Sequence, residues 1–211
     1  MLNQTKRWVL AGLLLVSIDA LASGSTSLVD LQHDWAHVQY ELEGDAQIEA
    51  FEALIKVANR SVQETPDSPE IAIWAAIIKS SYAGKASMLR AGGLVKEARK
   101  HLEWVVNKAP ETMDGSALTS LGALYYQVPG WPLSFGNKKE ARKYLEKALT
   151  LNPDGIDSNY FYGDFLAQQG EKDEALKVLK KAKAAASRPG RPVADEGRHQ
   201  EIDALIKKLE S

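Results

Sequence analysis

The sequence predicts an all-α fold, a right-handed superhelical stack of about four helical hairpins with a capping helix at its C-terminal end. Apolar residues recur at helical spacing along most of the 211 residues, breaker residues separate the helices, and one pattern of small residues occurs twice. Each copy pairs a glycine in one helix with two alanines in the next: Gly122 with Ala141 and Ala148, then Gly163 with Ala175 and Ala182. Small side chains at a crossing let two helices approach closely, so we expect each copy to form one hairpin.

The first 22 residues have the pattern of a secretory signal peptide. Lys6 and Arg7 precede an apolar run at residues 8–18, and Ala20 and Ala22 occupy the positions that signal peptidases read. The run is shorter than the roughly 20 residues of a membrane-spanning helix, and the chain has no cysteine for a lipid anchor. We therefore expect cleavage after Ala22 and a mature protein in the periplasm of a Gram-negative bacterium, without stable membrane insertion.

Composition limits the partners of the mature chain. Loss of the leader takes 26 basic and 28 acidic residues to 24 and 27, so the net charge changes from −2 to −3. A mildly acidic chain without a basic run is a poor match for nucleic acid or an anionic membrane surface. Because the sequence has no cysteine, disulfides and thiolate metal sites are excluded, and stability has to come from packing.

The N-terminal half is expected to form two hairpins, at about residues 28–64 and 69–108. Apolar residues fall at helical spacing in both, and Pro69 suits the first turn of a helix. Within the second hairpin, Gly92 and Gly93 are expected to end a glycine-containing turn. The partner helix then presents the apolar residues Leu94, Ala98, Leu102, Val105 and Val106.

The C-terminal half is expected to form two more hairpins, at about residues 114–151 and 156–186. The turn of the third hairpin is seven residues longer than that of the fourth, judged from the spacing of their glycines. The longer turn brings two prolines and two aromatic residues, Trp131 and Phe135. It is therefore a distinct feature on a regular array.

A connector and a last helix complete the predicted domain, which covers residues 23–211. Two prolines and a glycine prevent residues 187–192 from continuing a helix. Asp195 is then expected to cap a helix at residues 195–210, whose apolar residues form one stripe. Such a helix suits the end of a stack, where it covers the last hairpin.

The repeated pattern resembles the tetratricopeptide repeat, a helix-turn-helix unit of 34 residues. Gly122 and Gly163 are 41 residues apart, which is one such repeat plus the seven-residue insertion, and Pro110 and Pro153 stand where that family has its closing proline. The resemblance covers most of the mature chain and is weakest before Pro66. In the fourth hairpin it rests on Gly163, Leu166, Gly170, Ala175, Leu179 and Ala182.

This resemblance implies a non-catalytic scaffold that binds a protein or peptide partner of the cell envelope in its concave groove. An exported protein of this kind also resembles, more weakly, the periplasmic T-component proteins of TRAP transporters. This resemblance rests on the predicted export, the helical-repeat architecture and the aromatic insertion. That second resemblance implies a small-molecule or lipid-binding accessory protein of a transporter. The two functions remain alternatives at this point.

In the tetratricopeptide family the first helix of each hairpin lines the groove, and ligands lie there. The strongest candidates for ligand contact are Lys79, Tyr82, Tyr126, Tyr160 and Asp164, because tyrosine offers a large contact area with a polar tip. The alternative is that some of these rings fill space between hairpins. The other groove positions implied by the resemblance are Ser116, Thr119, Ala123, Asp157 and Gln168.

The long third turn suggests a further hypothesis. Insertions in repeat proteins often map to the binding face, so Trp131 and Phe135 are expected to fold over the groove as one wall of a ligand pocket. The alternative is that these two rings plug a gap beside the enlarged second hairpin.

Two histidines raise the possibility of a metal hydrolase. His33 and His37 have the spacing of the zinc-protease signature, with Asp34 where that signature has its glutamate base. A zinc site needs three protein ligands and the sequence marks no third. We therefore expect two exposed histidines, no metal, no cofactor and no enzymatic activity.

The connector contains two arginines that need acidic partners. Our hypothesis is that the connector crosses back over the concave face and pairs with Asp164 through Arg188 or Arg191. Asp154, Asp157 and Asp164 could together form an acidic patch for a cation or for Arg188 and Arg191, but capping and solvation at a helix N-terminus explain Asp154 and Asp157 more simply.

Overall fold

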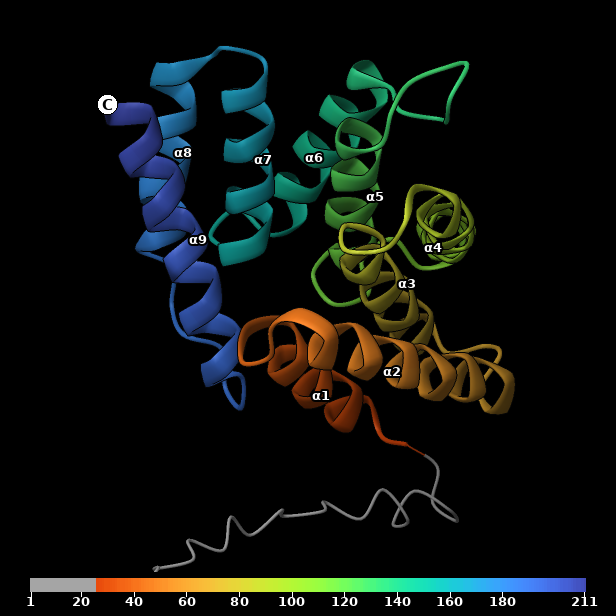
Figure 1. The fold of residues 1–211 in the computed structure, drawn as a ribbon. Helices are drawn as coiled ribbons and strands as arrows, with labels where there is room; N and C mark the ends of the chain where they lie inside the picture. Colours follow the sequence, from red (N-terminus) through yellow and green to blue (C-terminus); the bar gives the residue numbers. More distant parts are fainter. Residues whose placement is uncertain (1–25) are drawn as a thin grey trace, which may run out of the picture.

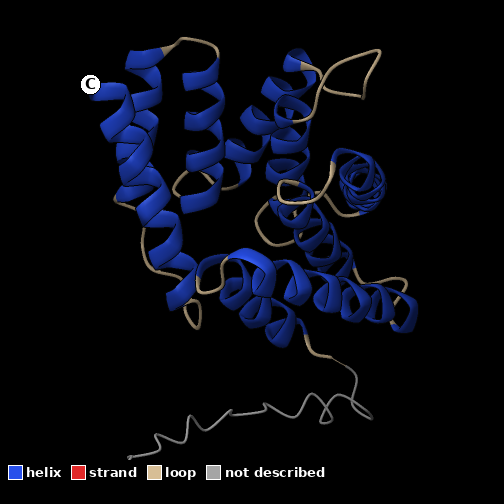
Figure 2. Ribbon diagram, in the orientation of Figure 1, coloured by secondary structure: helices blue, strands red, loops and turns tan. Residues whose placement is uncertain are grey.

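The computed structural model describes residues 26–211, which form nine α-helices (Figure 1). The predicted signal peptide lies outside the described residues. The rest of the described chain consists of loops and turns (Figure 2), with one isolated bridge between Gly130 and Gly136. The predicted all-α class is confirmed.

The first eight helices pair in chain order as four hairpins, and a ninth helix follows. Each second helix also packs on the first helix of the next hairpin, which makes a continuous stack. Across residues 26–211, no helix has the length and apolar character needed to cross a membrane. The helices are α1 (Leu28–Tyr40), α2 (Gly44–Glu64), α3 (Pro69–Ala83), α4 (Met88–Lys108), α5 (Ser116–Gln127), α6 (Lys138–Leu151), α7 (Ile156–Gln168), α8 (Lys172–Lys183) and α9 (Pro192–Glu210).

Local capping signals start several of these helices. Ser27 opens α1 with a capping box, in which its hydroxyl accepts from the Asp30 amide and the Asp30 carboxylate accepts from the Ser27 amide. Ser68 caps α3, with Pro69 in the first turn. Asn137 caps α6 directly after the long loop. These bonds satisfy amides that a helix start otherwise leaves unpaired.

The expected helix stop at Gly92 and Gly93 is wrong, because α4 continues through both glycines. A glycine inside a helix costs only about 1 kcal/mol relative to alanine. Farther along α4, Ala98 and Leu102 are fully buried, and this burial offsets the cost. Packing farther along α4 therefore outweighs the cost of the two glycines.

Glycines in the third and fourth hairpins allow the close helix crossings that the sequence predicts. A Cβ atom at Gly122 would lie 2.7 Å from Cγ of Leu145, and one at Gly163 would lie 2.7 Å from Cγ of Leu179. Both distances are far below van der Waals contact. The four alanines of the repeated pattern are fully buried, so small residues do set the spacing of these helices.

The C-terminal helix does more than cover the last hairpin. α9 packs on α8 and α7 and also contacts α1, so that the two ends of the stack meet (Figure 1). A Cβ atom at Gly197 of α9 would lie 2.3 Å from the ring of Tyr40 in α1. In the connector, the carbonyl oxygen of Gly190 lies 2.8 Å from Nε2 of His33. The stack is therefore closed by α9, where we expected a simple terminal cap.

We expect Gly163→Ala to lower the free energy of unfolding and Gly92→Ala to raise it. At Gly163 the new methyl group meets the buried Leu179 side chain, and such overpacking costs about 1–3 kcal/mol, against a helix-propensity gain of about 1 kcal/mol. At Gly92 no atom lies within 4 Å of the new Cβ, so the gain remains. Urea unfolding followed by circular dichroism measures both, and equal midpoints for the two variants would contradict the close crossing.

Candidate functional site

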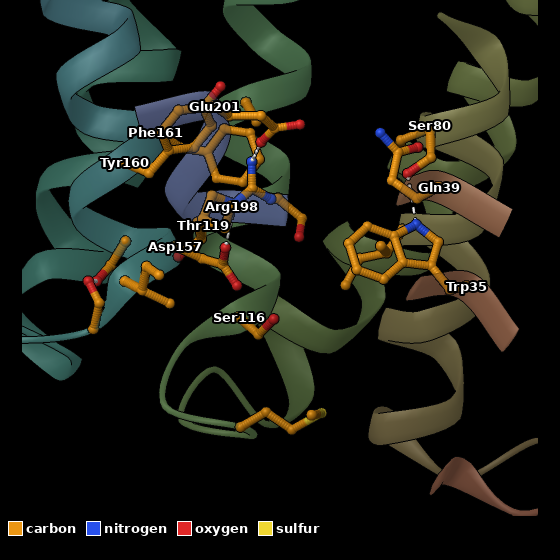
Figure 3. A pocket seen from close by; sticks show the side chains of 18 of the residues that line it. Trp35, Gln39, Ser80, Ser116, Thr119, Asp157, Tyr160, Phe161, Arg198 and Glu201 are labelled. Carbon is orange, nitrogen blue, oxygen red and sulfur yellow. Dashed lines mark hydrogen bonds and ion pairs between the residues drawn. The ribbon is translucent and has the colours of Figure 1, made fainter. Parts of the chain in front are cut away.

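The concave side of the stack encloses a chamber of about 750 Å³ (Figure 3). Its walls come from α1, α3, α5, α7 and α9 and from the connector that joins α8 to α9. The first helices of all four hairpins therefore face the inside, and α9 closes the remaining side. Small-molecule sites in proteins usually have volumes of about 300–1,000 Å³, so the chamber has the size of a ligand site.

Two tryptophans form an aromatic wall on one side of the chamber. Trp35 of α1 and Trp74 of α3 pack edge to face with ring centroids 5.5 Å apart, and Tyr40 packs on Trp35 at 5.6 Å. Nε1 of Trp35 donates a hydrogen bond to Oγ of Ser81 (2.9 Å). Both indoles are buried, so packing and this bond hold the wall in place.

Helix α5 contributes a polar wall without charge. Ser116, Thr119, Ser120 and Ala123 share one face of the helix, and Gln127 extends it. In Figure 3, Ser116 lies between Trp35 on the aromatic side and Asp157 on the charged side of the chamber. Hydroxyl groups both donate and accept hydrogen bonds, so this wall suits a polar ligand of either hydrogen-bonding character.

Asp157 of α7 organises a charged wall. Its carboxylate accepts hydrogen bonds from Nε of Arg198 in α9 (2.8 Å) and from Nη1 of Arg188 in the connector (2.5 Å). Arg188 also binds Asp195 through Nε (2.6 Å), and Arg198 binds Glu201. These ion pairs attach both the connector and α9 to α7.

The charged groups in this wall shift each other's pKa values. Burial alone would raise the pKa of Asp157, but the neighbouring guanidinium groups of Arg198, Arg188 and Arg191 outweigh it and lower the pKa to about 2. Burial raises the pKa of Glu201, against the attraction of Arg198. At neutral pH Asp157 is therefore fully ionised and holds its two partners.

Most groove positions implied for α5 and α7 do face the inside. Ser116, Thr119, Ala123, Asp157 and Tyr160 line the chamber. Three others, Tyr126, Asp164 and Gln168, do not belong to the lining. Oη of Tyr126 donates to Oδ2 of Asp164 at 2.6 Å, and Nε2 of Gln168 donates to the same oxygen at 3.1 Å.

The two groove residues expected in the second hairpin are misplaced. Lys79 is buried between α3 and α4, where its ammonium group lies 2.9 Å from a carboxylate of α4. Tyr82 is buried and donates to a carboxylate of α2 (2.8 Å). Trp74 itself faces the chamber, and at about 100° per residue its helical neighbours on that face are Ile77 and Ser81.

The expectation that the long loop folds over the concave groove is wrong; its residues 132–135 instead line a separate hollow of about 460 Å³ against α4. Trp131 is 90% exposed, and neither Trp131 nor Phe135 lines the chamber. Figure 1 shows the loop between α5 and α6 projecting outward from the stack. Phe135 packs edge to face on Tyr125 (5.7 Å) and under the guanidinium of Arg99 (4.8 Å). Phe135 thus fills space beside the second hairpin, as the alternative proposed, whereas Trp131 does not.

The two histidines of α1 have separate partners. His33 lies against the carbonyl oxygen of Gly190, and Nδ1 of His37 lies 2.7 Å from the carboxylate of Glu41. In the part of the chain that the structure describes, no three side chains of metal-ligating type come together. The pair therefore does not have the geometry of a zinc-protease site.

The connector does cross back over the concave face, but with a different partner from the expected one. Arg188 binds Asp157, whereas Asp164 binds Tyr126. Asp157 lies in the first turn of α7, at the helix N-terminus as expected, but the N-cap position is Gly155 and Asp157 is the centre of an ion-pair network.

Several lining residues were not predicted from the sequence. Trp35, Tyr40, Arg198 and Glu201 come from α1 and α9, at opposite ends of the described chain. No local pattern brings such distant segments together. The only available signal was the unusual connector, in which two arginines alternate with two prolines.

Paired helices stacked around a concave chamber define a helical-repeat protein. Residues 133–190 match the sequence model of the tetratricopeptide repeat family, and a comparison with curated proteins gives no match. Among solved structures, the chain is similar to a thermophilic tetratricopeptide-repeat protein of Thermus thermophilus. The TM-score is 0.58 and the identity 20%, covering 87% of this chain and 85% of that chain. The chain therefore has the fold of a tetratricopeptide-repeat protein, and its residues 133–190 have the sequence of the repeat.

We expect Asp157→Asn to destabilise the protein at neutral pH by about 3 kcal/mol, because the buried Arg198 loses a charged partner. The pKa of Asp157 is lowered to about 2, so its contribution is fully present above the ordinary aspartate pKa of about 4 and is lost as the pH falls toward 2. The stability difference between wild type and variant should therefore shrink over this range in thermal unfolding.

Asp154→Asn is the matched control for this experiment, because the Asp154 side chain is 85% exposed and its ion pair is at the surface. It should leave stability nearly unchanged at every pH. A difference between wild type and Asp157→Asn that stays constant from neutral pH to the acid limit would contradict the assigned pairing.

We expect Trp131→Ala to change the unfolding free energy by less than about 0.5 kcal/mol, because an exposed side chain contributes little to stability. Phe135→Ala should cost about 1–2 kcal/mol, since it removes the packing on Tyr125 and Arg99. Scanning calorimetry separates the two. A Trp131→Ala protein that melts as early as Phe135→Ala would mean that the indole is buried in solution.

Proposed function

We propose that this tetratricopeptide-repeat protein is a binding protein without a reaction centre, whose ligand occupies the chamber. The observation that carries the proposal is the contact of α9 with α1, which turns the concave face of the stack into a chamber of ligand size. Proteins with this fold generally act as scaffolds for binding, so the proposed activity agrees with the fold.

A compact ligand suits the chamber better than an extended partner chain. A long peptide lies in a groove that is open at both ends, whereas here the connector and α9 cross from α7 to α1. Aromatic, hydroxyl and charged walls face one cavity, which is the usual composition of a small-molecule site. This favours the second function considered from the sequence, a small-molecule binder such as an accessory protein of a transporter.

Nothing in the charged wall requires catalysis to explain it. Asp157, Arg188 and Arg198 are bound to one another, so their charges are used in holding α9. Tyr160, whose pKa burial raises to about 12, stays protonated at neutral pH and serves as a hydrogen-bonding and packing group.

A protein partner at the outer edge is a second candidate function. The loop between α5 and α6 presents Trp131 and Leu133 with 90% and 83% of their surface exposed. Exposed tryptophans are common anchors in protein interfaces. Such a partner would bind outside the chamber, so the two functions do not exclude each other.

We also propose that the mature protein works in the periplasm. The support is the leader-like sequence of residues 1–22. Edman sequencing of the protein isolated from the periplasmic fraction tests both the compartment and the cleavage site after Ala22.

We expect native mass spectrometry of the protein purified from its own cells to show a retained small molecule. Ser120→Phe should reduce the occupied fraction at least tenfold, because Ser120 lines the chamber and the larger ring takes up its space. Thr150→Phe, on the exposed face of α6, is the matched control and should retain the ligand. If Ser120→Phe, folded by circular dichroism, keeps the same ligand, the chamber is not its site.

A further inference from the structure

The chamber wall contains one guanidinium group without a carboxylate partner, and this group defines the kind of ligand. The inference rests on the proposed function, since it concerns the same chamber. Arg188 and Arg198 share three carboxylates in the charged wall. Lys85 and Asp114 lie exposed at the rim, where water and salt screen their charges. Arg191 of the connector is therefore the arginine of the chamber wall that has no ion-pair partner among the described residues.

The positive charge of Arg191 is in an unfavourable position. Within residues 26–211 no carboxylate oxygen lies within 4.0 Å of its guanidinium, which instead lies over the ring of Trp74 at 4.9 Å. Burial and repulsion by Arg188 lower the pKa of Arg191 to about 10, although Asp157 and Asp195 attract it from a distance. The group is still protonated at neutral pH, so an added negative charge beside it would be stabilised.

Buried polar atoms without hydrogen-bond partners gather at the same place. The described residues contain four such side-chain atoms, and three belong to residues that line the chamber: Nε of Arg191, Nε1 of Trp74 and Oε1 of Gln39. Native proteins pair almost all buried polar groups, so three in one cavity wall indicate that a partner enters the cavity. Two of the three are donors, which favours a ligand rich in acceptors.

We propose that the chamber binds a small organic molecule with a single carboxylate group, which pairs with the guanidinium of Arg191 beside Trp74. A planar guanidinium binds a carboxylate through two parallel hydrogen bonds, a match that other anions share less well. One unpaired cation suits one negative charge. A phosphate dianion would bring a second charge close to Asp157 and Glu201 and meet repulsion.

The remaining walls define the body of this carboxylic acid. Trp35 of α1 and Phe161 of α7 lie on different sides of the chamber (Figure 3), and Trp74 and Ile77 of α3 add apolar lining, so the body has to contain an apolar or aromatic portion. The hydroxyl wall of α5 lies between them and accommodates polar substituents. The ligand class is therefore an amphipathic monocarboxylate that fits about 750 Å³.

The test uses 3-phenylpropionate and octanoate as probes, each compared with its neutral amide, and phenyl phosphate as the dianion. Isothermal titration calorimetry on the full mature chain, freed of ligand, should show each carboxylate binding at least tenfold more tightly than its amide. Arg191→Gln should abolish this preference, and Arg191→Lys should keep part of it, because the charge remains while the bidentate geometry is lost. Arg60→Gln, which removes an exposed arginine of α2 outside the chamber, should change nothing.

The outcomes separate this inference from the proposed function. Equal affinity for carboxylate and amide, tighter binding of phenyl phosphate, or an unchanged preference in folded Arg191→Gln would overturn the monocarboxylate assignment. Failure of both carboxylates to bind would overturn it as well. In each case the chamber still stands as a binding site if native mass spectrometry shows a ligand that Ser120→Phe releases, and the proposed function fails only when that release is absent.

Discussion

The ion pairs that Asp157 makes with Arg188 and Arg198 hold the structure in its closed form. Arg188 joins the connector to α7 and Arg198 joins α9 to α7. One carboxylate therefore positions two segments that are not part of any hairpin. Buried ion pairs contribute little net stability after desolvation, but a misplaced partner would leave a buried charge unpaired. Their effect is thus mainly to select one position for α9, and the close approach of Gly197 to Tyr40 makes that position tight.

The chamber follows from this closure together with the regularity of the stack. The first helix of every hairpin turns the same face inward, which is why α5 and α7 supply lining residues at the same repeat positions, Thr119 and Tyr160. Without α9 these faces would form an open groove. With α9 docked on α1, the groove gains a fourth wall, and the aromatic pair Trp35 and Trp74 forms another side of the chamber, where Arg191 of the connector lies over Trp74.

Local signals explain which parts of this structure were predictable from the sequence. The glycine and alanine spacing of the third and fourth hairpins encodes their crossing directly, and Gly163 has the steric role that its position predicts. The sequence did not predict which face of α3 lines the groove. Trp74 could pack between helices or face the groove, and its sequence neighbours do not decide between the two. Closure depends on curvature summed over four hairpins, a long-range property, so neither α9 on α1 nor the position of Arg191 follows from any short segment.

Closure and binding share residues, and this couples them. The connector that brings Arg191 to Trp74 is held by Arg188 on one side and by His33 at Gly190 on the other. A ligand that pairs with Arg191 therefore binds only when the connector and α9 are docked, and binding to one state stabilises that state by mass action. The unpaired donor of Arg191 weakens the closed form when the chamber holds no ligand, and an acceptor supplied by a ligand removes that penalty. Occupancy and docking of α9 should thus rise and fall together, with the ion pairs of Asp157 setting the position and the ligand adding to its stability.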